Sequence, residues 1–234
     1  MAIRKKEFYR NLVRLALPIT LQSLMLASVA AADALMLGKV EQNEMTAVSQ
    51  ATQIQFIQNM FLTAIAAAGS VLGAQYWGKG DRRTLEDIFH MILRFCGIVS
   101  ILFFAACECA PGLLMRVFTH DEPLIAIGSA YLRIAGWSYL LTGISQCYLA
   151  MMKITDHAKP GALISACAVL LNICLNAVLI FGLLGAPRMQ ARGAALATTI
   201  SRVVELVLCI AVSFGASYLR PVPSRFGKLS KLLR

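Results

Sequence analysis

Residues 15–37 read LALPITLQSLMLASVAAADALML, a continuous apolar run in which Asp33 is the one charged side chain. The run is long enough for a helix that crosses the hydrocarbon of a bilayer, which takes about 20 residues. A charge near the middle of a bilayer costs on the order of 2.5 to 3.5 kcal/mol, so such residues usually contact ions, protons or substrates. The alternative is a carboxylate that snorkels to the membrane surface, because Gly38 and Lys39 lie only about a turn beyond it.

The composition of the chain indicates a membrane protein. Hydrophobic residues make up 58% of the 234 residues and the mean hydropathy is +0.68, which is too apolar for an ordinary soluble domain. Further apolar runs follow the first, and they do not alternate with period two, which excludes a β-barrel. These runs cover residues 54–77, 88–107, 124–152, 161–186 and 193–219.

The sequence therefore predicts an all-α integral membrane fold, a bundle of six transmembrane helices that forms one lobe over residues 1–219. The connectors are short and contain Gly and Pro, so none of them could hold a soluble domain. Residues 220–234 are expected to be a basic cytoplasmic tail or a linker between lobes. The expected helices are 12–37, 46–77, 86–109, 123–152, 160–185 and 192–219.

The positions of Lys and Arg explain the net charge of +10 and predict the orientation. If the N-terminus is cytoplasmic, the cations at 4–14, 79–83, 153–159 and 220–234 lie on the cytoplasmic side, and the opposite side carries Lys39, Arg116, Arg188 and Arg192. This excess predicts a multi-pass protein of the cell membrane with both termini cytoplasmic. Cations beside a membrane have anionic lipid headgroups as partners, so we expect no binding of nucleic acid.

The cysteines predict no metal centre and no redox chemistry. Cys107 and Cys109 make a C-x-C at a helix end, without a second Cys or His pair nearby. Most of the others fall inside apolar runs, where a thiol behaves as a small hydrophobe. No nucleophile and base are spaced for catalysis and no nucleotide-binding loop is present, so we expect neither an enzyme nor an organic cofactor.

Polar side chains follow one face of several predicted helices, because residues three, four, seven or eleven apart point the same way on a helix. Packing explains part of this, since small and hydroxylic residues let membrane helices approach closely. Polar faces on five helices most economically line one shared, hydrated cavity. The residues predicted for the substrate cavity are Gln22, Gln55, Asn59, Ser138, Thr142 and Gln146, and the other polar faces carry Asp33, Asn172 with Asn176, and Thr198 with Arg202 and Glu205.

Asparagine oxygens, a threonine hydroxyl and a carboxylate are hard oxygen donors. Such a set can hold a monovalent cation, or can hydrogen-bond a carboxyl group that binds a proton. In either case Asp33 is expected to bind the cation or proton, and to release it when the cavity opens to the other side of the membrane. Arg202 and Glu205 lie one turn apart and are interpreted as a local ion pair that lowers the cost of burying both charges.

Several short strings, in order and at matching spacing, make the chain resemble the amino-terminal half of the multidrug and toxic compound extrusion (MATE) transporters. Their superfamily also contains oligosaccharide-lipid flippases. The similarity runs through nearly the whole chain. The strings are Leu17-Pro18-Ile19, DALMLG at 33–38, AQYWGKGD at 74–81, YLRI at 131–134, NICLN at 172–176, and GAALAT at 193–198 followed by Ser201-Arg202.

The resemblance implies a six-helix lobe that encloses a polar cavity open to one side of the membrane. It also implies that Asp33 is the carboxylate that couples transport to a cation, with Asn172, Asn176 and Thr198 around it. Many relatives have an acidic residue at the position of Asn176, so the amide here favours H⁺ over Na⁺ as the coupling ion.

The resemblance also implies a partner lobe, since family members have two such lobes and about twelve helices, and substrate passes between them. The expected partner is a missing carboxy-terminal half or another chain. Three explanations of the length stay open: a truncated product, which we favour, a half-transporter that pairs with a second chain, and a degenerate remnant. A lone lobe would expose its polar cavity wall to lipid, so the active form is expected to be at least a pair.

The leading hypothesis is a secondary antiporter that exports organic, often cationic compounds in exchange for H⁺ or Na⁺. The alternative is a lipid-linked saccharide flippase, which would need basic residues for a pyrophosphate, and Arg94, Arg133 and Arg202 are the candidates within the spans. A non-transporting membrane subunit is the third hypothesis, and it predicts that replacing Asp33 with Asn changes nothing.

Overall fold

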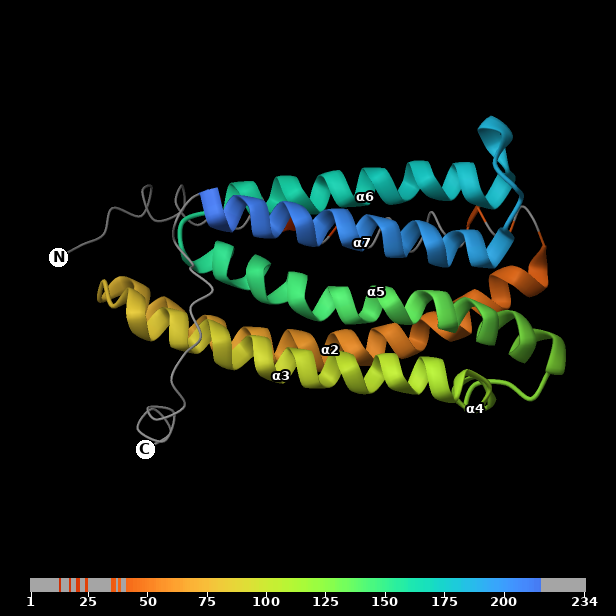
Figure 1. Cartoon of the computed structure of the whole chain (residues 1–234), viewed down its shortest axis with the longest axis horizontal. Coiled ribbons are helices and arrows are strands. Elements are labelled where there is room, and N and C mark those ends of the chain that lie inside the picture. Colours follow the sequence, from red (N-terminus) through yellow and green to blue (C-terminus); the bar gives the residue numbers. More distant parts are fainter. Residues whose placement is uncertain are drawn as a thin grey trace.

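The computed structural model describes residues 41–215 and, before them, single positions at 13, 17, 20, 21, 24, 35, 36 and 38. The described chain is all-helical, with labels as in Figure 1. Its elements are α2 Gln42–Gly78, α3 Arg82–Cys109, α4 Pro111–Arg116, α5 Glu122–Ile154, α6 Ala158–Phe181, a 3-10 turn at Leu183–Gly185, and α7 Gln190–Gly215. The predicted helix 12–37 lies outside the described residues apart from those single positions.

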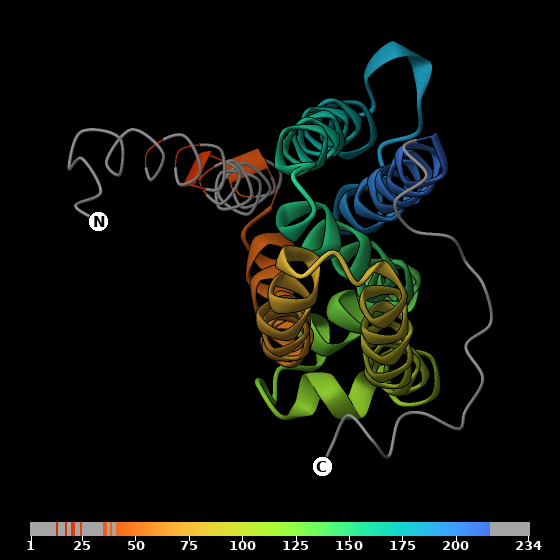
Figure 2. The same ribbon diagram turned by 90° about the vertical axis from the view of Figure 1, so that its left-hand side faces the viewer.

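Five of the described helices, all but the short α4, are long and apolar enough to cross a membrane. They lie side by side along the long axis of the bundle (Figure 1). α5 packs against α2, α3 and α7, and α6 packs mainly on α7. α4 lies across one end of the bundle, as Figure 2 shows. We call this the α4 end, and the opposite end, where α2 turns into α3, the Gly80 end.

Two helices begin earlier than the sequence pattern predicted. α2 begins at Gln42 and not at 46, so Glu44 lies within the helix. α3 begins at Arg82 and not at 86, because Asp81 caps it: the Asp81 carboxylate accepts hydrogen bonds from the Thr84 backbone N–H at 3.1 Å and from the Thr84 hydroxyl at 2.6 Å. The first turns of both helices contain charged residues, so a prediction based on apolar runs placed the helix starts too late.

The end of α6 and the helix α4 also differ from expectation. α6 ends at Phe181 and not at 185, because Gly182 takes the left-handed conformation at φ 73° and stops the helix. α4 begins at Pro111, where proline suits the first turn, inside a segment expected to be a connector. A helix of 6 residues buries too little surface to give a periodic pattern.

The apolar core has two clusters, one toward each end of the bundle. The cluster at the α4 end includes Ile54, Met115 and Leu132, and the cluster at the Gly80 end includes Leu62 and Leu85. Between the two clusters, the buried face of α2 carries Gln58. This residue lies between Ile54 and Leu62 on the same face and is fully buried.

Gln58 ties three helices together at the junction of the two clusters. Its Nε2 donates to the Tyr139 carbonyl on α5 at 2.9 Å and to the Ser100 hydroxyl on α3 at 3.4 Å. These bonds satisfy the amide nitrogen, and a buried donor left without a partner costs on the order of 1 to 3 kcal/mol. Gln58 therefore fixes the register of α2 against α3 and α5.

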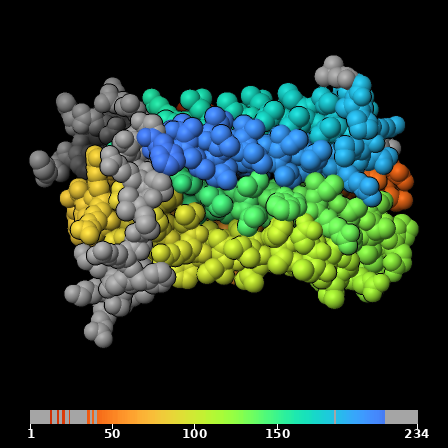
Figure 3. Space-filling view, viewed as in Figure 1, coloured from red at the N-terminus to blue at the C-terminus, as the bar shows by residue number. Residues whose placement is uncertain are grey.

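Small residues let the helices approach closely. A Cβ added to Gly69 on α2 would collide with Ile92 on α3, and one added to Gly143 on α5 would collide with Ser100 on α3. Close approach through glycine is a general feature of helix contacts in membranes, where van der Waals packing replaces the hydrophobic effect. Figure 3 shows the resulting tight parallel bands of α7, α5 and α3 on one face.

The outward faces of α2 and α3 carry large apolar side chains that are exposed in this lobe. Phe56, Met60 and Phe61 project from α2, and Phe95 and Leu102 project from α3. An apolar surface of this extent would be unfavourable in water and suits a lipid environment. The exposed surface therefore agrees with the span lengths in indicating a multi-pass membrane protein.

Replacing Gly193 with Ala is expected to destabilise the contact between α6 and α7 by about 1 to 3 kcal/mol. A Cβ at this position would lie 2.8 Å from the carbonyl oxygen of Leu179, and that oxygen already accepts from the Met189 N–H at 2.9 Å. Thermal unfolding of the purified protein measures the effect. Gly97→Ala is the matched control, since its added Cβ meets nothing within 4 Å; an equal loss in both variants would contradict the assignment.

Candidate functional site

Asn172, Asn176 and Thr198, three of the residues predicted to bind the coupling ion, lie together where α6 packs on α7. Asn176 Nδ2 donates to Asn172 Oδ1 at 3.1 Å, and Asn172 Nδ2 donates to Thr198 Oγ1 at 3.3 Å. Thr198 in turn donates to the Ala194 carbonyl at 2.9 Å. We call these three residues the amide cluster.

The amide cluster is shielded from solvent within the lobe. Asn172 is 4% exposed and Asn176 is fully buried, while Thr198 is half-buried. Polar groups buried at this depth are retained only when other polar groups satisfy them. Two amides and a hydroxyl that are hydrogen-bonded to one another thus form a local polar site between two apolar helices.

The predicted residues on α5 are buried, and their hydroxyl groups bond within their own helix. Ser138 donates to the Ala135 carbonyl at 2.6 Å, and Thr142 donates to the Ser138 carbonyl at 2.7 Å. Such bonds to a preceding turn are the usual way a helix satisfies Ser and Thr in an apolar setting. Gln146 is half-buried on the same helix. The role of these three residues in binding substrate stays a prediction.

The predicted residues on α2 are not brought to the amide cluster. Gln55 and Asn59 are half-buried, and within residues 41–215 α2 makes no contact with α6. The amide that α2 does bury is Gln58, which the sequence analysis missed. Gln58 lies four residues from both Ile54 and Leu62, and this spacing could have placed it on the buried face of α2. Gln22 and Asp33 lie outside the described residues.

Arg202 and Glu205 form the ion pair that their spacing predicted. Arg202 Nη1 lies 2.7 Å from Glu205 Oε2, and the side chains are 20% and 2% exposed. Removing one partner of such a buried pair leaves an uncompensated charge, which costs about 3 to 5 kcal/mol. The pair begins one turn beyond Thr198 on the same face of α7.

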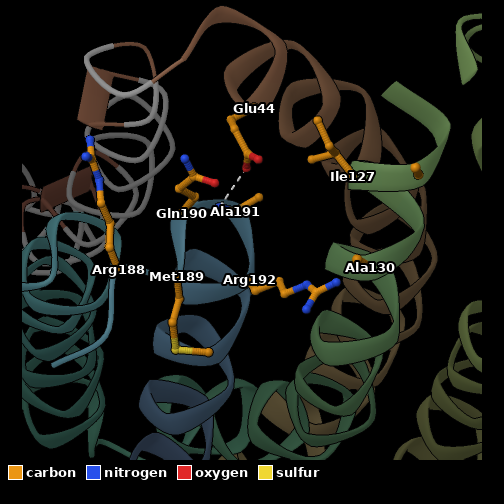
Figure 4. A pocket seen from close by; sticks show the side chains of 9 residues that line it. Glu44, Ile127, Ala130, Arg188, Met189, Gln190, Ala191 and Arg192 are labelled. Atoms are coloured by element: carbon orange, nitrogen blue, oxygen red, sulfur yellow. Dashed lines mark hydrogen bonds between the residues drawn. The ribbon is translucent and has the colours of Figure 1, made fainter. Parts of the chain in front are cut away.

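A second polar site lies at the α4 end, where a cavity of about 430 Å³ opens between α2, α5 and the start of α7. Figure 4 shows Glu44 of α2 pointing at the first turn of α7, and Arg192 reaching across toward Ala130 of α5. Arg188 also lines the cavity. The cavity is therefore charged on the α2 and α7 sides and apolar on the α5 side.

Glu44 caps α7 although it belongs to α2. Its Oε2 accepts a hydrogen bond from the Ala191 backbone N–H at 2.9 Å, and the residue is 8% exposed. A carboxylate at this position satisfies a free N–H of the first turn and interacts favourably with the helix dipole. Sequence analysis placed Glu44 in a connector, and no local signal could identify a partner far along the chain.

Replacing Glu44 with Ala is expected to cost about 1 to 2 kcal/mol of stability, because the first turn of α7 loses its cap. Glu44→Gln keeps an acceptor oxygen for the Ala191 N–H and should lose less than half of that. Thermal unfolding measures both variants, and hydrogen exchange at the first turn of α7 localises the change. An equal loss in the two variants would show that the charge, and not the hydrogen bond, carries the effect.

Comparison with known proteins agrees with this fold. Residues 18–178, more than half of the chain, match the family model described as MatE. The chain is 24% identical over 202 residues to an uncharacterized transporter of Bacillus subtilis, YisQ, and 27% identical over 210 residues to the multidrug resistance protein NorM of Vibrio cholerae. These alignments cover 86% and 88% of this chain, and 44% and 45% of the relatives.

A solved structure, the crystal structure of MATE in the bent conformation, superposes with a TM-score of 0.82 at 18% identity, over 94% of this chain and 50% of that one. This likeness concerns the fold. The chain spans about half the length of the relatives and structures that it matches. With the family model matched over most of the membrane-spanning region, the chain belongs to the MatE family of membrane transporters.

Proposed function

We propose that this lobe works as one half of a secondary antiporter that exports organic, often cationic compounds in exchange for H⁺ or Na⁺, with Asp33 as the coupling carboxylate. The observation that carries the proposal is the amide cluster, in which buried Asn172 and Asn176 meet Thr198 across two helices. Several relatives are named as multidrug resistance proteins, which supports the class of substrate.

Each member of the amide cluster has a role in the proposed cycle. The two amides can offer either oxygen or N–H, so the cluster can stabilise a charged carboxylate through its N–H groups or hold a cation through its oxygens. Asn176 is neutral, so the cluster without Asp33 carries no negative charge, which favours H⁺ as the coupling ion over Na⁺. In this proposal Asp33 takes up the ion on one side and releases it on the other.

We further propose that the functional unit contains a second six-helix lobe, supplied by a carboxy-terminal half or by another chain, and that both termini of this lobe are cytoplasmic. Matches that cover about half of the relatives support the first point. The excess of Lys and Arg on the Gly80 end, including Lys79 and Arg82, supports the second, because cytoplasmic loops carry the excess of basic residues.

The flippase hypothesis is less well supported. Of the arginines that could hold a pyrophosphate, Arg202 is neutralised by Glu205 at 2.7 Å, and Arg133 is exposed on α5. A basic cavity would need guanidinium groups that face inward without an acidic partner. Within the described residues we see no observation that favours this activity over export of organic compounds.

Reconstitution in proteoliposomes tests the proposal. The chain is reconstituted together with a second lobe, either joined to it or as a separate chain. The proteoliposomes are loaded with ethidium and exposed to a pH gradient, a sodium gradient or neither. We expect dye export that depends on the pH gradient and continues when sodium is absent. Export that needs neither gradient, or none under any condition with a correctly folded protein, would contradict the proposal.

A further inference from the structure

The Arg202–Glu205 pair holds a positive charge away from the amide cluster. On an α-helix the Cα–Cβ bond tilts toward the N-terminus, so an arginine at 202 would by default lie over the turn that contains Thr198. In the structure its Nη1 instead lies 2.7 Å from Glu205 Oε2, three residues toward the C-terminus. Glu205 is thus the anchor that draws the guanidinium away from Thr198.

The Glu205 carboxylate is buried, while the Arg202 guanidinium is partly exposed. The Glu205 side chain is 2% exposed and that of Arg202 is 20% exposed. Thr198, half-buried on the same face of α7, donates to the Ala194 carbonyl and accepts from Asn172 Nδ2 at 3.3 Å. Four residues along a helix correspond to about 6 Å, so a released guanidinium would reach the hydroxyl of the amide cluster.

Within the described residues, the stretches of α5 and α6 that lie beside this part of α7 carry no charged side chain. Residues 138–149 of α5 and 161–176 of α6 contain no Asp, Glu, Lys, Arg or His. Cys209, one turn beyond Glu205, is buried on the same face and is the nearest titratable neighbour along α7. In the described part of the chain, the electrostatic balance at this level of α7 therefore depends on these two residues.

We propose that Glu205 is a positioning residue that sets the affinity of the lobe for its coupling cation, by neutralising Arg202 and holding it away from the amide cluster. This rests on the proposed function, since it assigns a determinant of cation loading to the same site. An uncompensated guanidinium about 6 Å from a bound cation would weaken loading on the order of 10- to 100-fold at the effective dielectric of protein interiors.

The direction in which three variants change the cation affinity separates this role from a purely structural one. Glu205→Gln should raise the cation concentration that half-saturates transport on the order of tenfold or more, with little change in the KM for dye. Arg202→Gln removes the repulsive charge, so loading should be as tight as in the unmodified chain or tighter. The double variant with both changes should return to within about twofold of the unmodified chain.

A structural ion pair predicts a different pattern. Both single variants would then weaken loading and thermal stability together, and the double variant would improve stability without a specific return of cation affinity. Equal losses of cation affinity in Glu205→Gln and Arg202→Gln would overturn the proposal. If the single variants do not fold, the double variant still tests it, because a cation affinity far from that of the unmodified chain contradicts charge compensation.

A second readout needs no transport. Thr198→Cys is introduced in a background without the exposed Cys109, Cys167 and Cys174, and its reaction rates with a cationic and an anionic methanethiosulfonate reagent are compared. Adding Glu205→Gln should shift the ratio of rates toward the anionic reagent by about tenfold, and adding Arg202→Gln as well should reverse the shift. An unchanged ratio overturns the inference.

The two readouts distinguish this inference from the proposed function. If the unmodified chain moves no dye under any ion gradient, the proposed function fails, and the ratio of reagent rates still reports whether Glu205 controls the charge beside Thr198. If dye export is coupled to a cation but the ratio and the half-saturating concentration are insensitive to Glu205, the inference fails and the proposed function stands.

Discussion

Asp33→Asn is expected to abolish gradient-driven export of dye, by at least about a hundredfold in initial rate. The amide has nearly the shape of the carboxylic acid but cannot change its charge, so it cannot load and release a proton or a sodium ion. Exchange of dye for dye in the absence of a gradient should persist, because the variant resembles the protonated state. Efflux from proteoliposomes under an imposed pH gradient measures the first effect, and counterflow measures the second.

The control for this prediction is a second Asp to Asn change outside the spans. Asp156 lies in the loop after α5, is exposed, and accepts from Trp77 Nε1 at 3.3 Å. Its φ of 63° is one that Asn tolerates well, and an amide oxygen can still accept from the indole. Asp156→Asn should therefore leave export unchanged. Export that survives Asp33→Asn would support a non-transporting subunit or a different coupling residue.

Asn172→Leu is the second change with a large expected effect. Asn172 is the middle of the amide cluster, accepting from Asn176 and donating to Thr198, so its removal takes a hydrogen-bond partner from buried Asn176 and from half-buried Thr198. We expect loss of most coupled export, roughly tenfold or more, together with about 1 to 3 kcal/mol of stability. Transport under a pH gradient and thermal unfolding measure the two effects.

Thr155→Ala is the matched control for Asn172→Leu. Thr155 is buried like Asn172, but the hydrogen bond that its hydroxyl donates goes to the Met151 carbonyl one turn back in the chain, so its loss leaves no side chain on another helix unsatisfied. We expect a change in stability below about 1 kcal/mol and near-normal export. If Thr155→Ala disrupted export as strongly as Asn172→Leu, the loss would follow from removing any buried polar group, and not from the amide cluster.

Much of this fold could be predicted from the sequence, because apolar runs of membrane length leave little choice of structure. The runs located the five long described helices, and Asn172 and Asn176 were identified as neighbours because they are four residues apart. The Arg202–Glu205 pair followed from the same geometry. Contacts within one helix are local, so the helical repeat alone determines them.

The features that residue spacing could not predict depend on contacts between helices. The contact of Asn172 with Thr198 was implied by the family resemblance alone, since the two residues lie on different helices. Glu44 caps a helix that begins far along the chain, and nothing near it in the sequence indicates that partner. Gln58 was passed over for its neighbours Gln55 and Asn59, because the polar stripe on α2 was taken as the functional face.

The proposed role of Asp33 in coupling dye to a cation is tested by following the cation when a dye gradient drives transport. Proteoliposomes with no ion gradient are given a dye gradient, and the internal pH and sodium are followed. We expect protons to move opposite to the dye, and we expect no such movement in Asp33→Asn. Dye movement without any opposing proton or sodium movement would contradict this role.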